Sequence, residues 1–265
     1  MSDIKIIYAP TVTLISEPKF IEPNHLQVNW LGESTDGEKL VEYSGRLCYM
    51  SQHNPAKKET YIYIQNILEQ QHGSVIEHAN YSFLLEGVSR SLTHELVRHR
   101  IMSYSQLSQR FVDESEAGFV IPPSIIGFKE LEEDFKTFVN GANLTYKRLF
   151  STLDALYTPL IENRLERRKK AREAARSVLP NSVETKIVVT ANIRAWRHVL
   201  EMRSSPHAER EIRRLAVLLV EKFKKIAPIF FQDFEIIVAE DGLHSCNDNF
   251  KILKENRSYF LEFFY

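Results

Sequence analysis

Ser89–Arg110 reads S-R-S-L-T-H-E-L-V-R-H-R-I-M-S-Y-S-Q-L-S-Q-R. Its first half has apolar residues at helical spacing, and the polar run that follows has no such spacing. A serine such as Ser89 accepts a hydrogen bond from an unpaired N–H in the first turn of a helix, and apolar residues follow at helical spacing up to Val97. Residues 101–120 lose that spacing and are expected to form a loop with short extended pieces. The stretch therefore predicts a short capped helix that leads into a loop rich in Arg, Ser and Gln.

Outward from this stretch, the apolar spacing predicts strands and helices in alternation. The predicted strands are Ile4–Tyr8, Val12–Leu14, Tyr81–Leu85 and Lys186–Thr190. Helices are predicted over 38–50, Ile193–Met202 and Ala208–Ile226. A further helix is marked by Tyr61, Ile64, Ile67 and Leu68 and is expected to stop at His72-Gly73. A long helical segment is predicted over 129–176, with interruptions near Gly141 and Pro159. Strands and helices mixed in this way indicate an α+β (mixed α/β) fold.

The chain shows no internal repeat, no low-complexity linker and no sharp change in composition. A single domain over 1–240, followed by a C-terminal extension over 241–265, is the simplest interpretation. Apolar residues of that extension recur at helical spacing between Ile252 and Phe264. They predict an amphipathic segment that packs on the body or on a neighbouring subunit, with a frayed end as the alternative.

Composition narrows the class of protein. The 265 residues have a formal net charge of −1, with 43% hydrophobic and 26% charged residues, as in an average soluble protein. A generic nucleic-acid or membrane-surface binder would be more basic, so an anionic ligand would have to meet a local cluster of Arg and Lys. Two cysteines, Cys48 and Cys246, suit a reducing cytoplasm. Neither a signal-peptide pattern nor an apolar run near the roughly 18 residues of a membrane span is present, so we expect a cytoplasmic protein without membrane attachment.

Several common site motifs are absent from the sequence. The nine glycines never form G-x-G-x-x-G, so no Rossmann turn is expected. Gly32 and Gly37 have Walker spacing, but Glu38-Lys39-Leu40 follows where Lys-Ser/Thr is needed. His94 and His99 lie five residues apart, which puts their rings roughly 140° apart on a helix, and we expect no metal site.

Positive charge concentrates in three places. Arg90–Arg110 and Arg164–Arg176 are Arg-rich, and a third set follows Asn192, where Arg194 and His198 share a helical face. Each set could instead have a purely structural role. The first could be a solvated basic face, the second a surface helix with i,i+4 ion pairs, and the third a helix cap with surface charges. The first set is nevertheless rich in Arg, His, Ser and Gln, whose directional hydrogen bonds suit phosphates and heterocycle edges.

These residues resemble those of a known family. Arg98-His99-Arg100 and Ser108 have the R-H-R-x7-S form of the flavin-dependent thymidylate synthases (the ThyX family). The other matching blocks are His72–His78, Ala175–Pro180, Asn192-x-Arg194 and Met202–Ala208, in the family's order within about 40–235. The resemblance implies a central sheet flanked by helices, a homotetramer with active sites at subunit interfaces, and methylation of dUMP to dTMP. Methylenetetrahydrofolate would donate the carbon and NADPH-reduced FAD the hydride.

The resemblance also implies which residues form the sites. Flavin contacts would be Ser74, Arg98, His99, Arg100, Gln106, Asn192, Arg194 and His198. Substrate contacts would be Glu95, Arg98, Gln106, Leu107, Ser108, Gln109, Arg110, Arg176 and Arg203. Arg203 would be catalytic, polarising the uracil ring. Many relatives carry Gln where this chain has Glu95, and an ionised Glu would accept from a donor such as the ribose hydroxyl.

The sequence also bears on the role of Ser108 and on one alternative function. Ser108 lacks a matched base and a nucleophile elbow, so we expect it to position the nucleotide rather than attack it. A non-catalytic RNA-binding module could use the same Arg clusters, but only Tyr104 and Phe111 supply interleaved aromatics, so nucleic acid is not expected as a partner.

Overall fold

The structure is a computed structural model that describes residues 4–248 and mixes helices with strands, as the sequence predicts. The chain divides into two compact units. Unit 1 comprises 4–13, 84–99 and 104–189, and unit 2 comprises 14–83, 100–103 and 190–248. Within 4–248, no helix combines the length and the apolar character that crossing a bilayer requires.

A four-stranded sheet has the order β2-β3-β6-β4. Its strands are β2 (Thr11–Ser16), β3 (Asn80–Ser89), β6 (Glu184–Asn192) and β4 (Ser103–Gln106). The predicted strands at Tyr81–Leu85 and Lys186–Thr190 lie inside β3 and β6, which are longer because both run on to the cap of the following helix. Burial alternates along β6, so every second side chain faces the interior.

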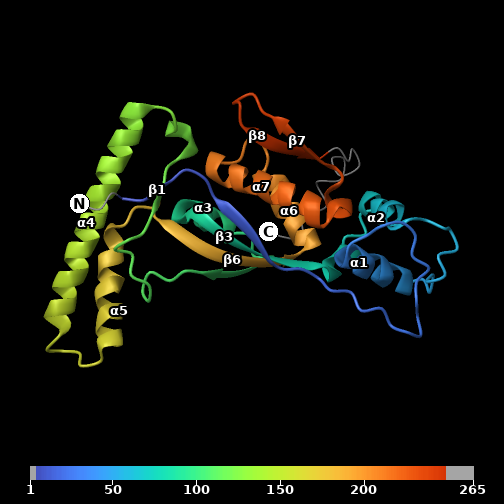
Figure 1. Ribbon diagram of the computed structural model, residues 1–265, viewed down its shortest axis with the longest axis horizontal. Helices are drawn as coiled ribbons and strands as arrows, with labels where there is room; N and C mark the ends of the chain where they lie inside the picture. Colours follow the sequence, from blue (N-terminus) through green and yellow to red (C-terminus); the bar gives the residue numbers. More distant parts are fainter. Residues whose placement is uncertain (1–3, 249–265) are drawn as a thin grey trace. The chain divides into compact units, whose positions relative to one another are not determined.

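Unit 1 holds the capped helix and a long helical hairpin. Helix α3 (Arg90–Leu96) starts after Ser89, whose hydroxyl accepts from the Leu92 N–H at 3.0 Å, as predicted. Helices α4 (Lys129–Tyr157) and α5 (Arg164–Ala175) lie side by side (Figure 1). A two-residue strand β1 (Ile6–Ile7) pairs in parallel with β5 (Phe119–Val120), so the predicted strand at Ile4–Tyr8 is shorter than expected.

The predicted interruption at Gly141 is wrong. Helix α4 continues through it, and a Cβ placed at Gly141 would meet nothing within 4 Å. A glycine costs a helix interior about 1 kcal/mol relative to alanine, which packing along a long helix can offset. The break near Pro159 is confirmed, because proline separates α4 from α5.

Unit 2 is built from helices and a hairpin around aromatic residues. Its helices are α1 (Asp36–Leu47), α2 (Thr60–Glu69), α6 (Ile193–Arg203) and α7 (Arg210–Ile226). Phe83 of β3 meets Trp196 of α6 and Phe223 of α7 edge to face, at ring-centroid distances of 5.4 and 5.1 Å. Both α6 and α7 contact β8 (His244–Asp248), which pairs antiparallel with β7 (Phe234–Val238) (Figure 1).

Two features of unit 2 differ from the sequence reading. Helix α2 does not stop at His72-Gly73: it ends at Glu69, and Gln71 takes the left-handed conformation, with φ of 57°. The β7–β8 hairpin was not predicted, although Asp241-Gly242 in its turn is a recognisable hairpin signal. The amphipathic segment expected between 252 and 264 lies outside the described residues.

A buried ion pair of unit 2 joins Arg197 on α6 to Asp233, just before β7. The Arg197 Nη1 donates to Asp233 Oδ1 at 2.7 Å, and Nη2 donates to Oδ2. Both residues are buried. The pair ties helix α6, with its predicted site residues, to the C-terminal part of unit 2.

Asp233→Ala should lower the free energy of unfolding by about 3–5 kcal/mol, because it leaves a guanidinium buried without its counter-charge. Chemical denaturation measures the change. Glu133→Ala is the matched control: it removes the exposed pair with Lys136, and should cost at most about 1 kcal/mol. Equal losses in the two variants would contradict a structural role for the buried pair.

Candidate functional site

The Arg98-His99-Arg100 segment follows α3 as a turn rather than continuing the helix. Helix α3 ends at Leu96, so His94 and His99 do not share a helix and the zinc-protease pattern is excluded. The Tyr104 hydroxyl is placed to donate to the carbonyls of Leu96 and His99, at 2.7 and 2.9 Å. Arg98 is exposed and His99 half-buried, so the turn holds its backbone fixed while the arginine reaches solvent.

Gln106, at the end of β4, has an amide whose orientation is set by two threonines. Its Nε2 donates to Thr93 Oγ1 at 3.0 Å and to Thr185 Oγ1 at 3.3 Å. Both threonines are buried, with exposures of 0% and 1%. The amide nitrogen is therefore engaged, which leaves the carbonyl oxygen as the group that Gln106 can offer to a donor on a ligand.

The loop after Gln106 is fixed through the backbone of Leu107. The Leu107 N–H donates to the Lys186 carbonyl at 2.9 Å, and Arg90 Nη2 donates to the Leu107 carbonyl at 2.9 Å. Ser108 Oγ accepts from the Arg110 N–H at 3.4 Å. Ser108 thus contributes to the local turn, and its role in positioning the nucleotide stays a prediction.

Unit 1 gathers cations and unsatisfied donors around this loop. Buried nitrogens of Arg90 (Nε), Gln109 (Nε2) and Arg110 (Nε) lack a hydrogen-bond partner within the described residues. Burial lowers the pKa of Arg90; nearby Glu114 opposes this shift, while the cation of Arg176 adds to it. Arg110 is held by Glu173 at 3.1 Å, in a pair exposed enough to exchange partners. Such a set of guanidinium and amide donors is suited to a phosphate.

Unit 2 contains a second set, centred on Arg194 in the first turn of α6. Asn192 caps that helix by accepting from the Ala195 N–H at 2.8 Å. Arg194 Nη1 donates to Glu77 Oε1 at 2.6 Å. A Cβ at Gly73 would lie 2.9 Å from Arg194 Nε, so the guanidinium packs directly on the glycine backbone.

His198 and Arg203 lie further along the same helix. Burial of the imidazole lowers the pKa of His198, and Arg194 adds to the shift, although the residue as a whole is exposed. The ring is therefore neutral near pH 7 and can donate and accept. Arg203 is half-buried in the last turn of α6, and the chain just after it is anchored where the Cys246 N–H donates to the Ser204 carbonyl at 3.0 Å.

The predicted site residues thus fall into two groups. Unit 1 holds Glu95, Arg98, His99, Gln106, Leu107, Ser108, Gln109, Arg110 and Arg176. Unit 2 holds Ser74, Arg100, Asn192, Arg194, His198 and Arg203. Supporting residues such as Thr93, Thr185 and Tyr104 were missed as site residues. No local pattern marks them, because their roles come from hydrogen bonds that form only when the chain folds. No group of three or more His, Cys, Asp or Glu residues within 4–248 could hold a metal ion.

Comparison with known proteins identifies the family. The family model described as "Thymidylate synthase complementing protein" matches residues 31–229. The chain belongs to the flavin-dependent thymidylate synthase family. Relatives with that name from Mycobacterium sp. (strain JLS), Mycobacterium marinum and Mycobacterium avium are 46%, 44% and 45% identical to it, over 87% of this chain and 92% of each relative. The resemblance carried by the R-H-R-x7-S segment is thereby confirmed.

The residues present in unit 2 fit the flavin of this family. The close approach of Gly73 to Arg194 forms a cradle that any side chain would fill, and Glu77 holds the guanidinium against it. An arginine held in this way has a defined orientation, as recognition of a diphosphate requires.

Gly73→Ala should weaken flavin binding about tenfold or more, because the added methyl group must push Arg194 out of place. Flavin fluorescence titration measures the affinity. Gly141→Ala is the matched control, since a Cβ there meets nothing within 4 Å. Unchanged flavin affinity in Gly73→Ala would show that the position of Arg194 does not matter.

Glu114 makes the stability of the folded protein depend on pH. Burial raises the pKa of Glu114 to about 7; Arg90 opposes this, while Asp113 and Glu184 add to it. The folded protein therefore holds this proton up to a higher pH than the unfolded chain, whose carboxyl titrates near 4.5. The stability contributed by this group is present below about pH 4.5 and is lost as the pH rises toward 7.

Glu114→Gln should remove that decline, which amounts to up to about 3 kcal/mol. The melting temperature measured from pH 4.5 to 8 should fall less steeply in the variant than in the parent. Glu116→Gln, at an exposed position two residues away, serves as the control. Parallel curves for Glu114→Gln and the parent would contradict a raised pKa.

Proposed function

We propose that this chain is a thymidylate synthase that methylates dUMP at C5 to give dTMP, with methylenetetrahydrofolate as carbon donor and NADPH as reductant of bound FAD. Family membership supports the reaction, since the relatives carry the name of that activity. The observation that carries it to this chain is the donor set in unit 1. Unsatisfied buried nitrogens of Arg90, Gln109 and Arg110 and the fixed amide of Gln106 suit a nucleotide monophosphate.

In this proposal the nucleotide is bound by the loop after β4. Arg110 and Arg176 meet the phosphate, and Ser108 and Gln109 hold it through local hydrogen bonds. The carbonyl of Gln106 accepts from a donor on the uracil or flavin edge, and Glu95 accepts from the ribose hydroxyl. Arg98 and Leu107 contribute further nucleotide contacts.

The FAD would be held by Ser74, Asn192, Arg194 and His198 together with Arg98, His99, Arg100 and Gln106, and when bound it supplies the hydride for reduction of the transferred carbon. The protein's share is binding and electrostatics. Arg194 meets the diphosphate, held in place by Glu77 and Gly73. His198, neutral near pH 7, offers a hydrogen bond without adding charge.

The proposal also covers the domain architecture, the oligomeric state and the cellular location of the protein. The family's architecture, a central sheet flanked by helices in a single domain over 1–240 with an extension over 241–265, is proposed for this chain, as is a homotetramer with sites at subunit interfaces. A cytoplasmic location without membrane or nucleic-acid partners fits two cysteines that are both free. None of the relatives named above is described as an RNA-binding protein, so the RNA-binding alternative gains no support.

Tritium release from 5-tritiated dUMP, with NADPH and methylenetetrahydrofolate present, tests the reaction directly. The expected result is release that depends on both co-substrates, from a yellow protein with a flavin spectrum. A colourless protein that retains RNA and releases no tritium would overturn the proposal in favour of the RNA-binding module.

Arg203→Ala should reduce dTMP formation on the order of 10²–10³-fold while leaving NADPH oxidation by bound FAD in place. A guanidinium at N3 and O4 of the ring would stabilise the anionic form that attacks the one-carbon unit, and Arg stays charged at any working pH. Arg203→Lys should rescue poorly, because a point charge cannot reproduce the planar fork. Turnover of Arg203→Ala within a few-fold of the parent would show that Arg203 is not catalytic.

A further inference from the structure

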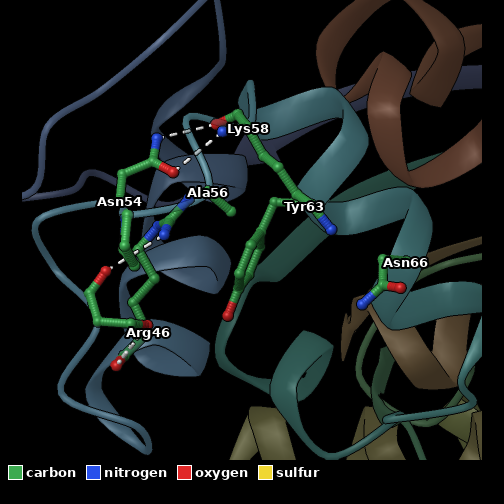
Figure 2. A pocket seen from close by; sticks show the side chains of 8 residues that line it. Arg46, Asn54, Ala56, Lys58, Tyr63 and Asn66 are labelled. Atoms are coloured by element: carbon green, nitrogen blue, oxygen red, sulfur yellow. Dashed lines mark hydrogen bonds between the residues drawn. The ribbon is translucent and has the colours of Figure 1, made fainter.

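Unit 2 has a pocket whose lining residues are not among the flavin and substrate residues that the family resemblance implies. It is lined by Arg46 at the end of α1, by Tyr63 and Asn66 of α2, and by the connecting segment with Ser51, Asn54 and Lys58 (Figure 2). Its volume is about 170 Å³. Binding sites for whole ligands usually enclose about 300–1,000 Å³, so this one has room for a single group of a larger molecule.

Arg46 lines this pocket although only 3% of the residue is exposed. Its Nε donates to Glu42 Oε1 at 2.7 Å, and Nη1 donates to the Ser51 carbonyl at 3.2 Å. Nη2 lies against the same Glu42 oxygen but has no hydrogen-bond partner within the described residues. A buried guanidinium that keeps unsatisfied N–H donors is costly unless something accepts from it.

Tyr63 also lines the pocket and lies directly against Arg46. The Arg46 guanidinium stacks over its ring, 4.6 Å from the centroid (Figure 2). A Cβ at Gly45 would lie 2.6 Å from the Tyr63 hydroxyl and 3.1 Å from Val75, which follows Ser74. Burial raises the pKa of Tyr63 and Glu42 adds to this, while Arg46 opposes it, so the hydroxyl keeps its proton and can donate.

The charges and donors of the pocket favour an anion. Lys58 forms no ion pair with any residue in 4–248. Its backbone is held by the Asn54 side chain: Asn54 Nδ2 donates to the Lys58 carbonyl at 2.9 Å, and the Lys58 N–H donates to Asn54 Oδ1 at 3.0 Å (Figure 2). Arg46 and Lys58 against Glu42 leave one uncompensated positive charge. The groups able to bond a ligand are the N–H donors of Arg46, Lys58 and Asn66 and the Tyr63 hydroxyl.

We propose that this pocket binds an oxyanion group, a phosphate monoester or a carboxylate, carried by one of the co-substrates. The Arg46 Nη2, the Lys58 ammonium, the Tyr63 hydroxyl and the Asn66 amide donate to its oxygens. The co-substrate source rests on the proposed function, because NADPH carries a 2′-phosphate and folates carry glutamate carboxylates. Gly45 and Val75 connect the pocket to the Ser74 segment within unit 2, which places an anchoring group close to the flavin residues of that unit.

Inorganic phosphate tests the pocket without any reference to catalysis. Phosphate should raise the melting temperature of the parent protein, and Lys58→Gln and Tyr63→Phe should each weaken the apparent phosphate affinity about tenfold, as expected for loss of one hydrogen bond to a charged group. Lys57→Gln is the matched control, because it removes the same charge from the adjacent residue, which does not line the pocket. An equal response in Lys58→Gln and Lys57→Gln would overturn the site.

Steady-state kinetics of the holoenzyme then identify the source. If the group is the 2′-phosphate, Lys58→Gln loses most of the preference in KM for NADPH over NADH, with kcat little changed. If it is a carboxylate, the variant loses the preference for triglutamyl over monoglutamyl methylenetetrahydrofolate. If Lys58→Gln retains both preferences, the assignment to a co-substrate is overturned. Failure of the parent protein to release tritium would instead refute the proposed function, while the phosphate result stands by itself.

Discussion

The hydrogen bond from Arg90 to the Leu107 carbonyl is the interaction on which the polar loop of unit 1 depends. Together with the bond from the Leu107 N–H to the Lys186 carbonyl, it fixes both backbone polar groups of Leu107. The side chains on either side, Gln106 and Ser108, gain their directions from that fixed backbone and from Thr93 and Thr185. A loop that would otherwise be mobile thus presents donors in a set arrangement, which lowers the entropy lost on binding.

A recurring arrangement would allow a chain of net charge −1 to bind anions. Each predicted anion-binding arginine is held by one carboxylate: Arg110 by Glu173, Arg194 by Glu77, and Arg46 by Glu42. The carboxylate orients the planar guanidinium and so gives its N–H donors a defined direction. Anion recognition would then depend on the direction of these donors rather than on an excess of basic residues.

Glycine illustrates how the same residue type has different physical consequences in this chain. Gly73 and Gly45 allow a side chain to approach the backbone, since a Cβ there would lie within 3.0 Å of Arg194 and Tyr63 respectively. Gly141 has open space around it and is simply tolerated within α4. The expected roles, a helix stop at Gly73 and a helix break at Gly141, were both wrong because glycine only permits a conformation, and its neighbours decide whether that freedom is used.

The sequence by itself determined the family, the alternation of helices and strands, and the order of the segments that carry the predicted site residues. Those features depend on local patterns: the Ser89 cap, the β-branched run in β6, and the R-H-R-x7-S spacing. Only the tertiary structure decided which carboxylate holds each arginine, how Gln106 is oriented, and that residues after 233 form a hairpin contacting α6 and α7. The physical reason is sequence distance: Glu77 and Arg194, or Gln106 and Thr185, meet through folding across many residues, and no local periodicity records such a meeting.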